Sequence, residues 1–457
     1  MNEHLRDILK KTDVEYAEIR LEETLNTRIA FTGVDLEDCS ENVSFGGNVR
    51  VLHKGAWGFT TFNSVNEIET KLKVAIGHAR IMGERRNEPF KLAEVPVIDI
   101  GIPLEVKKNP VDVPLNWKVE IMREYNSLAL DFDERITTTN SRYFDKKLKL
   151  TFVNSEGTAV VRHAVDLGFV VMSIVRNHEG SFFAYTMTGS SDDFNVVLNQ
   201  EDKVKKTAGD SILIADSKPV KGGEYTVILD PMLAGVFIHE AFGHLSEGDN
   251  VYEDPNLQKI MVLGREFGNS NLNVVDSGLE RGQRGYLPYD DEGVKTQRNY
   301  LIKDGKLVGR LHSRETATKM GESPTGNARA ITYQHPPIPR MRTTMIEPGN
   351  VPFEEMVRNT KKGLYCISSR GGQTNGELFT FTAADAFMIK DGKLAERVRD
   401  VTLTGNVFET LKNIDMIGND YMAEDGPGGC GKRGQMPLPT SEGSPHIRIQ
   451  NVVVGGQ

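Results

Sequence analysis

The segment HEAFGH, residues 239–244, combines two imidazoles and a carboxylate in an HExxxH pattern. Imidazole nitrogens are common zinc ligands, and a carboxylate beside them is the usual general base of a metal-dependent hydrolase. On a regular helix, a five-residue spacing puts His239 and His244 about 140° apart, on nearly opposite faces. A shared metal ion therefore requires a π-type turn, or a break just before His244. We expect Gly243 to absorb this distortion, because glycine has the freest backbone.

A catalytic zinc site needs three protein ligands and one open position, so a third ligand must come from elsewhere in the chain. Cys430 is the best candidate, because the glycines around it let the backbone approach closely, and Lys432 and Arg433 favour its thiolate form. Three other side chains remain alternatives for this position: Asp249, Glu247 and His335. Without a shared metal, the motif fits a regular helix that has His239 in the core and His244 near its end.

The other two cysteines are weaker candidates. Cys366 lies in the apolar segment GLYCIS, which is typical of a buried structural thiol, and Cys39 lies far from the motif in sequence. Three cysteines in 457 residues cannot form a disulfide framework, and an odd count suits a reducing compartment. We therefore expect a cytoplasmic protein.

The elements that position the motif follow from the residues before it. The segment EYTVILD, residues 224–230, predicts a strand. Asp230 and Pro231 then supply a helix cap and a proline at the first helical position, where its missing amide does no harm. The motif is thus expected at the end of a helix that begins at Pro231.

The rest of the sequence predicts an α+β fold, with a mixed N-terminal region that contains antiparallel sheets and a β-rich C-terminal domain that carries the HExxxH helix. Helical spacing is expected at residues 2–10, from residue 65, at about 117–131 and at about 193–213. Strands are expected at 17–22, in a hairpin over 43–63 and in a meander over 136–188. The hexapeptide IKDGKL occurs at 302–307 and 389–394, each time with a hairpin-type Asp-Gly turn.

These elements suggest four segments. Residues 1–90 form a first α+β unit, and residues 91–116 form a proline-rich connector. Residues 117–217 form a helix and antiparallel strands that pack with the first unit. Residues 218–457 form the β-rich metallopeptidase domain.

Composition excludes several classes of function. No apolar run approaches the roughly 18 residues that a membrane helix needs. A formal charge of −9, with a pI near 5.7, opposes direct binding to the phosphate backbone of nucleic acids. We therefore expect a chain that binds neither membrane nor nucleic acid directly.

Five blocks occur in order along the C-terminal part of the chain: HEAFGHLSEGD (239–249), PTGNARAITYQHPPIPRMRTT (324–344), GGQTNGELFTFTAADAFMIKDGK (371–393), MIGND (416–420) and CGKRGQ (430–435). Together they resemble the TldD/PmbA family of metallopeptidases, and the match is to the TldD branch, because the PmbA or TldE branch lacks the HExxxH pair. The resemblance is specific over roughly residues 220–457 and weaker over the N-terminal half. After CGKRGQ, the stretch MPLPTSEGSP departs from the family's more apolar, glycine-rich pattern.

The resemblance implies a zinc protease whose metal is held by His239, His244 and Cys430, with Glu240 as the general base that activates the zinc-bound water. It also implies a dimer, either a homodimer or a heterodimer with a TldE/PmbA-like subunit, that cuts unfolded polypeptides or modified precursor peptides in an enclosed cavity. His335 and Arg340 are candidates for contact with the substrate, although a structural role in a proline-rich loop also fits them. The motif alone equally allows a zinc hydrolase of a small amide or ester, or a scaffold with a structural zinc.

Overall fold

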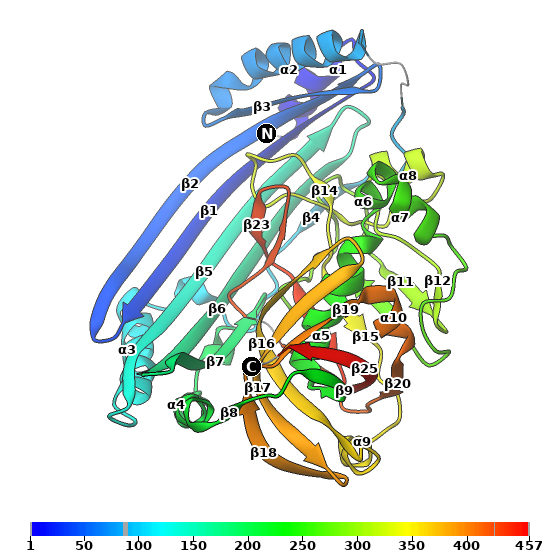
Figure 1. The fold of residues 1–457 in the computed structure, drawn as a ribbon. Helices are drawn as coiled ribbons and strands as arrows, with labels where there is room; N and C mark the ends of the chain where they lie inside the picture. Colours follow the sequence, from blue (N-terminus) through cyan, green and yellow to red (C-terminus); the bar gives the residue numbers. More distant parts are fainter. Residues whose placement is uncertain (1, 86–89, 425, 456–457) are drawn as a thin grey trace.

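The N-terminal half of the computed structural model is built on one seven-stranded sheet (Figure 1). The structure describes residues 2–85, 90–424 and 426–455, so residues 86–89 of the predicted first unit lie outside it. The strand order is β3-β2-β1-β5-β6-β4, and β7 also pairs with β6. These strands are β1 (Tyr16–Thr32), β2 (Asp35–His53), β3 (Ala56–Phe62), β4 (Asp99–Ile102), β5 (Ile136–Asn154), β6 (Ala159–Asn177) and β7 (Gly180–Ser190).

Four helices cover the two ends of this sheet. Helices α1 (Asn2–Lys10) and α2 (Ile68–Gly83) pack at one end, where Leu5, Leu72 and Val49 share a core. A Cβ atom on Gly58 of β3 would lie 1.9 Å from the carbonyl oxygen of Ala75, so a glycine lets β3 approach α2 closely. Helices α3 (Leu115–Leu130) and α4 (Glu201–Asp216) pack at the other end, against β5, β6 and β7.

The α+β class is confirmed, and three elements differ from the expectation. Strand β1 extends ten residues beyond the predicted end, because its polar residues pair with β2 and β5 instead of ending the strand. The connector contains β4, which pairs in parallel with β6. The helix expected from 193 begins only at Glu201, after a short 3-10 turn at Phe194–Val197.

The C-terminal half contains a closed ring of five strands and a second sheet. Pairing runs β16-β9-β25-β19-β17, and β17 pairs back to β16, with β18, β8 and β20 added outside this ring. The second sheet has the order β12-β11-β10-β15-β24-β21. Both IKDGKL segments turn as expected, with positive φ at Asp304 and Gly305 and at Asp391 and Gly392.

The remaining elements have the following bounds. The strands are β8 (Lys218–Pro219), β9 (Gly223–Leu229), β10 (Val274–Ser277), β11 (Arg298–Lys303), β12 (Lys306–Leu307), β13 (Ala328–Arg329), β14 (Ile338–Pro339), β15 (Thr343–Ile346), β16 (Lys362–Asn375), β17 (Leu378–Lys390), β18 (Lys393–Arg399), β19 (Thr402–Asn406), β20 (Ile414–Ile417), β21 (Met422–Glu424), β22 (Cys430–Lys432), β23 (Gln435–Leu438), β24 (Ser441–Ser444) and β25 (Ile447–Gly455). The helices are α5 (Pro231–Ile238), α6 (Gly248–Glu253), α7 (Pro255–Ile260), α8 (Arg314–Met320), α9 (Phe353–Arg358) and α10 (Val407–Lys412).

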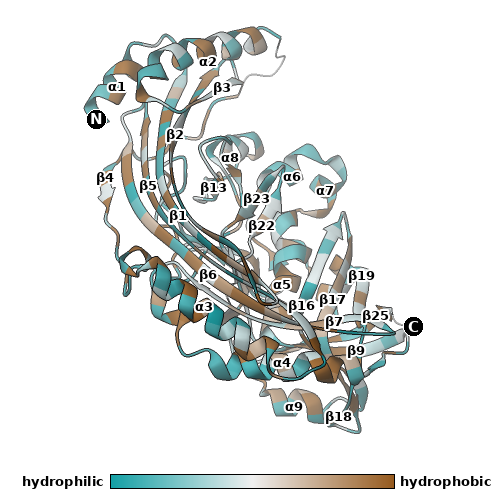
Figure 2. Cartoon of the chain, turned by 90° about the vertical axis from the view of Figure 1, so that its left-hand side faces the viewer, coloured by the Kyte–Doolittle hydropathy of each residue, from teal (hydrophilic) through white to brown (hydrophobic). Residues whose placement is uncertain are grey.

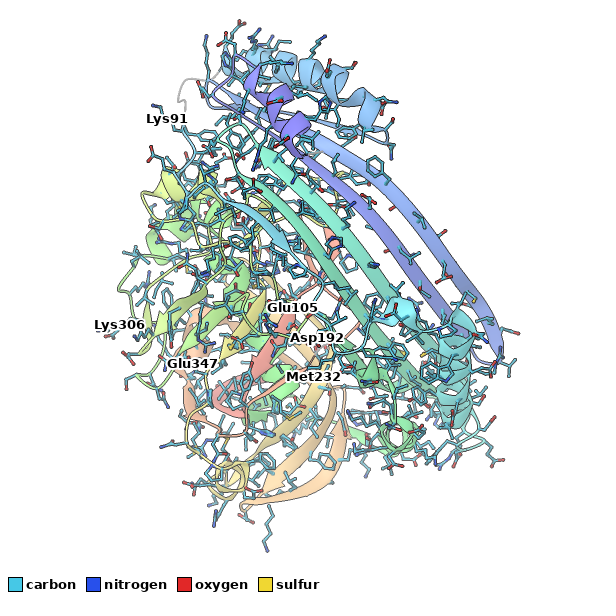
Figure 3. All side chains as sticks on the ribbon, turned by 180° about the vertical axis from the view of Figure 1, so that it is seen from behind. Lys91, Glu105, Asp192, Met232, Lys306 and Glu347 are labelled. Carbon is cyan, nitrogen blue, oxygen red and sulfur yellow. The ribbon has the colours of Figure 1, made fainter. Side chains whose placement is uncertain are left out.

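The long strands of the N-terminal sheet curve around the C-terminal half, which lies on their concave side (Figure 2). Buried ion pairs join the two halves: Asp291 lies 3.0 Å from Arg20 and 3.3 Å from Arg162, and Glu292 lies 2.8 Å from Arg50. From behind, Asp192 and Met232 lie at this junction, whereas Lys306 and Glu347 lie on the side away from the sheet (Figure 3). Within the described ranges, no helix is long and apolar enough to cross a membrane.

Candidate metal centre

The HExxxH motif lies at the end of a short, buried helix. Strand β9 ends at Leu229, and the side chain of Asp230 accepts a hydrogen bond of 2.8 Å from the amide of Leu233, which caps α5 as predicted. Phe237 of this helix packs edge-on against Phe379 and Phe381 of β17, with ring centroids 5.5 and 5.9 Å away. The apolar sequence of α5 thus anchors the motif in the core of the C-terminal half.

A π-helical turn over His239–Gly243 accommodates the five-residue spacing, which would put the two histidines on nearly opposite faces of a regular helix. The amide of His244 donates to the carbonyl oxygen of His239, and a 3-10 turn, His244–Ser246, follows. This extra residue in the turn brings the two imidazole rings onto the same side, with their centroids 5.4 Å apart and their planes nearly perpendicular. The predicted widening of the helix is therefore present.

Gly243 has a different role from the expected one. Its backbone is ordinary right-handed helix, with φ −57° and ψ −52°, so it does not absorb the distortion. A Cβ atom at this position would instead lie 2.0 Å from the sulfur of the buried Met341. Glycine here lets the turn pack closely against Met341, and a larger residue would require the Met341 side chain to move.

Three side chains converge beside this turn, and they are the three that the resemblance implies. One ligand atom each from His239, His244 and Cys430 lies within 4.8 Å of the others, and the Cys430 sulfur is 3.3 Å from Nε2 of His244. With usual zinc–sulfur and zinc–nitrogen bond lengths, the ligand atoms of a tetrahedral centre lie roughly 3.3–3.6 Å apart. The donor types and spacing of this cluster therefore fit a zinc ion.

Each imidazole has a carboxylate behind it. Nδ1 of His239 lies 3.2 Å from Glu442 of β24, and Nδ1 of His244 lies 3.0 Å from Glu247. A carboxylate at the far nitrogen fixes the orientation of a metal-binding imidazole and increases its basicity. Glu247 thus holds the His244 ring by a hydrogen bond, whereas Glu442 faces His239 as an ion-pair neighbour without one, and Nε2 of His244 points to the cluster.

The cluster is strongly polarised in the absence of metal. Burial alone would raise the pKa of the Cys430 thiol, but His239 and His244 outweigh burial and hold this pKa well below its usual value. Burial alone would lower the pKa of His239, but the Cys430 thiolate and Glu442 raise it to about 9. A thiolate is therefore already formed where a metal ligand is needed.

Lys432 stabilises the site in another way than predicted. Its Nζ lies 2.6 Å from Asp249 and 3.0 Å from Glu247, and it also donates to the carbonyl oxygen of Pro339. Burial would raise the pKa of Glu247, but Lys432 and His244 lower it to about 2. Lys432 thus ties the hairpin of β22 and β23, which carries Cys430, to the segment that follows the motif. The two histidines, rather than Lys432 and Arg433, favour the thiolate.

Glu240 lies at the open side of the cluster. Its Oε2 is 4.0 Å from Nε2 of His244, and the side chain is 28% exposed. A carboxylate in this position reaches both solvent and the cluster, which is what a general base for a water nucleophile requires.

The other candidates do not belong to the group of three converging ligands. Glu247 and Asp249 are ion-pair partners of Lys432, and His335 forms a turn through its amide, which donates to the carbonyl oxygen of Thr332. Arg340 is fully buried and donates to the carbonyl oxygen of Gln435 in β23. Contacts of His335 and Arg340 with substrate stay predictions.

Cys366 is buried in β16 and Cys39 is exposed on β2, and neither belongs to the metal-binding group. Glu442 was missed by the sequence analysis. No local pattern in its segment SEGS indicates a partner for His239, because the contact depends on long-range packing of β24 against α5.

Two histidines and a carboxylate at the end of one buried helix, together with a cysteine from the hairpin of β22 and β23, define a candidate metal-dependent hydrolase. Three family models match the chain: PmbA/TldA metallopeptidase domain 1 at residues 17–79, the central domain at 108–215 and the C-terminal domain at 222–456. The chain therefore belongs to the TldD/PmbA family and is a metalloprotease, as the motifs predict.

Relatives match over nearly the whole chain. A protein from Synechocystis named a metalloprotease is 41% identical over 446 residues, which is 98% of this chain and 96% of the relative. A zinc metalloprotease TldD homolog from Saccharolobus solfataricus is 29% identical over 454 residues, 96% of each chain. Two crystal structures share the fold over 99% of both chains: a protein from Thermotoga maritima, with TM-score 0.81 and 22% identity, and TldE from Thermococcus kodakarensis, with TM-score 0.76 and 18% identity.

Proposed function

We propose that this metalloprotease uses zinc, held by His239, His244 and Cys430, to hydrolyse peptide bonds of unfolded polypeptides or modified precursor peptides. The observation that carries the proposal is the number of converging ligands: among the residues that the structure describes, three side chains form the metal-binding group. A structural zinc site is closed by four protein ligands, whereas a catalytic site keeps one position open. Three ligands beside a partly exposed carboxylate favour catalysis.

The residues around this open position have distinct tasks. A bound zinc ion would supply a Lewis acid that polarises the scissile carbonyl and makes water more acidic. Glu240 takes the proton from the attacking water and delivers it to the leaving amine. Glu442 and Glu247 hold the two imidazoles in place, at 3.2 and 3.0 Å from their Nδ1 atoms.

We further propose that the active form is a dimer, either of two copies or with a TldE/PmbA-like subunit. The likeness of the fold to TldE supports a partner of similar shape. Enclosure by a partner would restrict the site to chains that can thread to it, so the state of folding of the substrate, more than its sequence, decides cleavage.

A matched pair of substrates tests this function. The purified protein is analysed for metal and then incubated with one protein presented folded and the same protein presented destabilised or reduced. We expect bound zinc, and cleavage of the unfolded form alone that stops when a chelator removes the metal. Similar cleavage of both forms would indicate an open cleft, and chelator-resistant cleavage would refute the metal chemistry.

A further inference from the structure

An arginine from another part of the chain contacts the glycine-rich loop before Cys430. Nη1 of Arg284 donates to the carbonyl oxygens of Gly428, at 2.6 Å, and of Gly426. These carbonyls lie two and four residues before the cysteine. Glycines allow many backbone conformations, so a loop of this composition needs external contacts to hold one of them.

The same guanidinium is anchored in the N-terminal sheet. Its Nε and Nη2 donate to the two carboxylate oxygens of Asp166 in β6, at 2.5 and 2.9 Å. It also lies over the ring of Phe144 in β5, 5.1 Å from the centroid. The Arg284 side chain is 3% exposed, so this two-pronged ion pair is shielded from water.

One further contact joins the loop to the N-terminal sheet, and another joins the segment of Arg284 to β24. A Cβ atom on Gly426 would lie 2.2 Å from the sulfur of Met187 in β7, so the loop also rests directly on the N-terminal sheet. The amide of Gly285, the residue after Arg284, donates to the hydroxyl of Ser441 at 3.0 Å, and Ser441 is next to Glu442. The segment of Arg284 therefore supports both Cys430 and the carboxylate behind His239.

We propose that Arg284 is a positioning residue for the metal centre, and that the N-terminal sheet, through Asp166, holds the Cys430 loop in its metal-binding conformation. This inference rests on the proposed role of Cys430 as a ligand. It gives the N-terminal half a defined part in the reaction: the C-terminal half carries all three ligands, but the third is held in place by a strand from the other half.

Arg284→Met and Asp166→Asn test the proposal, with Arg314→Met as a matched control. Arg314 is equally buried and also joins the halves, through two contacts of 2.7 and 2.8 Å to Glu156 and one to the carbonyl oxygen of Ala93, but it does not contact the loop. We expect Arg284→Met to weaken metal binding roughly 10–100-fold, in the range seen for outer-shell partners. Asp166→Asn should have a smaller effect in the same direction, and Arg284→Lys should restore part of the affinity.

Two readouts separate positioning from general destabilisation. In the cobalt-substituted protein, Arg284→Met should weaken the sulfur-to-metal charge-transfer absorption, whereas Arg314→Met should lower the melting temperature and leave this absorption unchanged. In the metal-stripped protein, peptide-level mass spectrometry should show faster alkylation of Cys430 in Arg284→Met, with the exposed Cys39 as internal reference.

Unchanged cobalt absorption and unchanged Cys430 alkylation in Arg284→Met would overturn the proposal. Equal changes in Arg284→Met and Arg314→Met would also overturn it, because the effect would then be general. The alkylation readout needs no metal, so it still judges the loop if the wild-type protein binds no zinc and the proposed function fails.

Discussion

The two halves of the molecule bury charged side chains in different arrangements. On the concave face of the N-terminal sheet, Arg20 and Arg50 are paired with carboxylates from both halves, at distances of 2.6–3.0 Å. In the C-terminal half, the Cys430 sulfur and two imidazoles face one another, with carboxylates behind the rings. Positive and negative groups neutralise one another in the first arrangement, whereas the second brings together electron-pair donors.

The ion pairs at the interface stabilise the fold, whereas the cluster provides the chemistry. Removing either partner of a buried ion pair lowers the stability of the fold, because the remaining charge is left unpaired in the interior. Without metal, protons on the two imidazoles neutralise the thiolate of the cluster, and a metal ion that displaces these protons finds three ligands already in place. Substitutions at the cluster should therefore change activity and metal content. Substitutions at the ion pairs of Arg20 and Arg50, which do not contact the Cys430 loop, should change stability instead.

The largest effect is expected for Glu240→Gln, which keeps the shape of the side chain and removes the base. Hydrolysis should fall by about two to four orders of magnitude, while zinc content and the melting temperature stay at wild-type levels. Steady-state kinetics with an unfolded peptide and metal analysis of the same sample measure both. Activity that survives this change would mean that another group accepts the proton.

Cys430→Ser should remove metal without removing the fold. A serine hydroxyl is a poor ligand near neutral pH, so zinc affinity should fall by more than the roughly 10–100-fold typical of outer-shell losses. Cys366→Ser and Cys39→Ser are the matched controls and should keep wild-type zinc content. If the Cys430 variant retains its zinc, the third ligand is one of the nearby carboxylates or His335.

Elements that depend on nearby residues could be predicted from the sequence. The helix at Asn2–Lys10 and both IKDGKL turns are present as expected, because capping, periodicity and turn residues act within a few positions. The full length of β1 could not be predicted, since polar residues such as Thr24 and Thr27 are buried where β1 pairs with β2 and β5. Strand β4 could not be predicted within the proline-rich segment, because it forms through pairing with β6 and packing against residues far along the chain.

The same distinction applies to the candidate site. The HExxxH motif alone predicts either a widened turn or a break before His244 if the two imidazoles share a metal, and the structure has the widened turn. Spacing alone did not decide whether Cys430 or another side chain is the third ligand, and the family resemblance favoured Cys430. The roles of Glu442 and Arg284 depend on contacts across 203 and 118 residues, with His239 and Asp166 respectively, and no local pattern encodes them.

Protons and metal should compete for the two imidazoles of the metal centre, which distinguishes this site from the interface ion pairs. The pKa of His239 is raised to about 9 and that of His244 well above its usual value, so near neutral pH both rings carry a proton that metal must displace. Metal affinity should therefore rise with pH, roughly 100-fold per unit below both pKa values. Chelator competition between pH 6.5 and 7.5, with proton release measured by calorimetry, tests this slope. An affinity that does not change with pH would contradict the polarised cluster.

The smallest effect concerns the interface and leaves the chemistry unchanged. Burial would raise the pKa of Asp291, but Arg20 and Arg162 outweigh it and lower this pKa to about 2. An unfolded aspartate titrates near 3.9, so the folded protein binds fewer protons than the unfolded chain between these values. Stability from Asp291 is thus complete above about pH 4 and is lost as the pH falls toward 2, with about 1 kcal/mol gone by pH 3. Urea unfolding at pH 7, 5, 4 and 3 measures the free energy of unfolding of both proteins. Between pH 7 and pH 3 this free energy should fall by about 1 kcal/mol less in Asp291→Asn than in the wild type, although the variant is less stable at pH 7. Its metal affinity at pH 7 should equal that of the wild type. Parallel stability curves for the two proteins would mean that Asp291 does not stabilise the interface as a charged group.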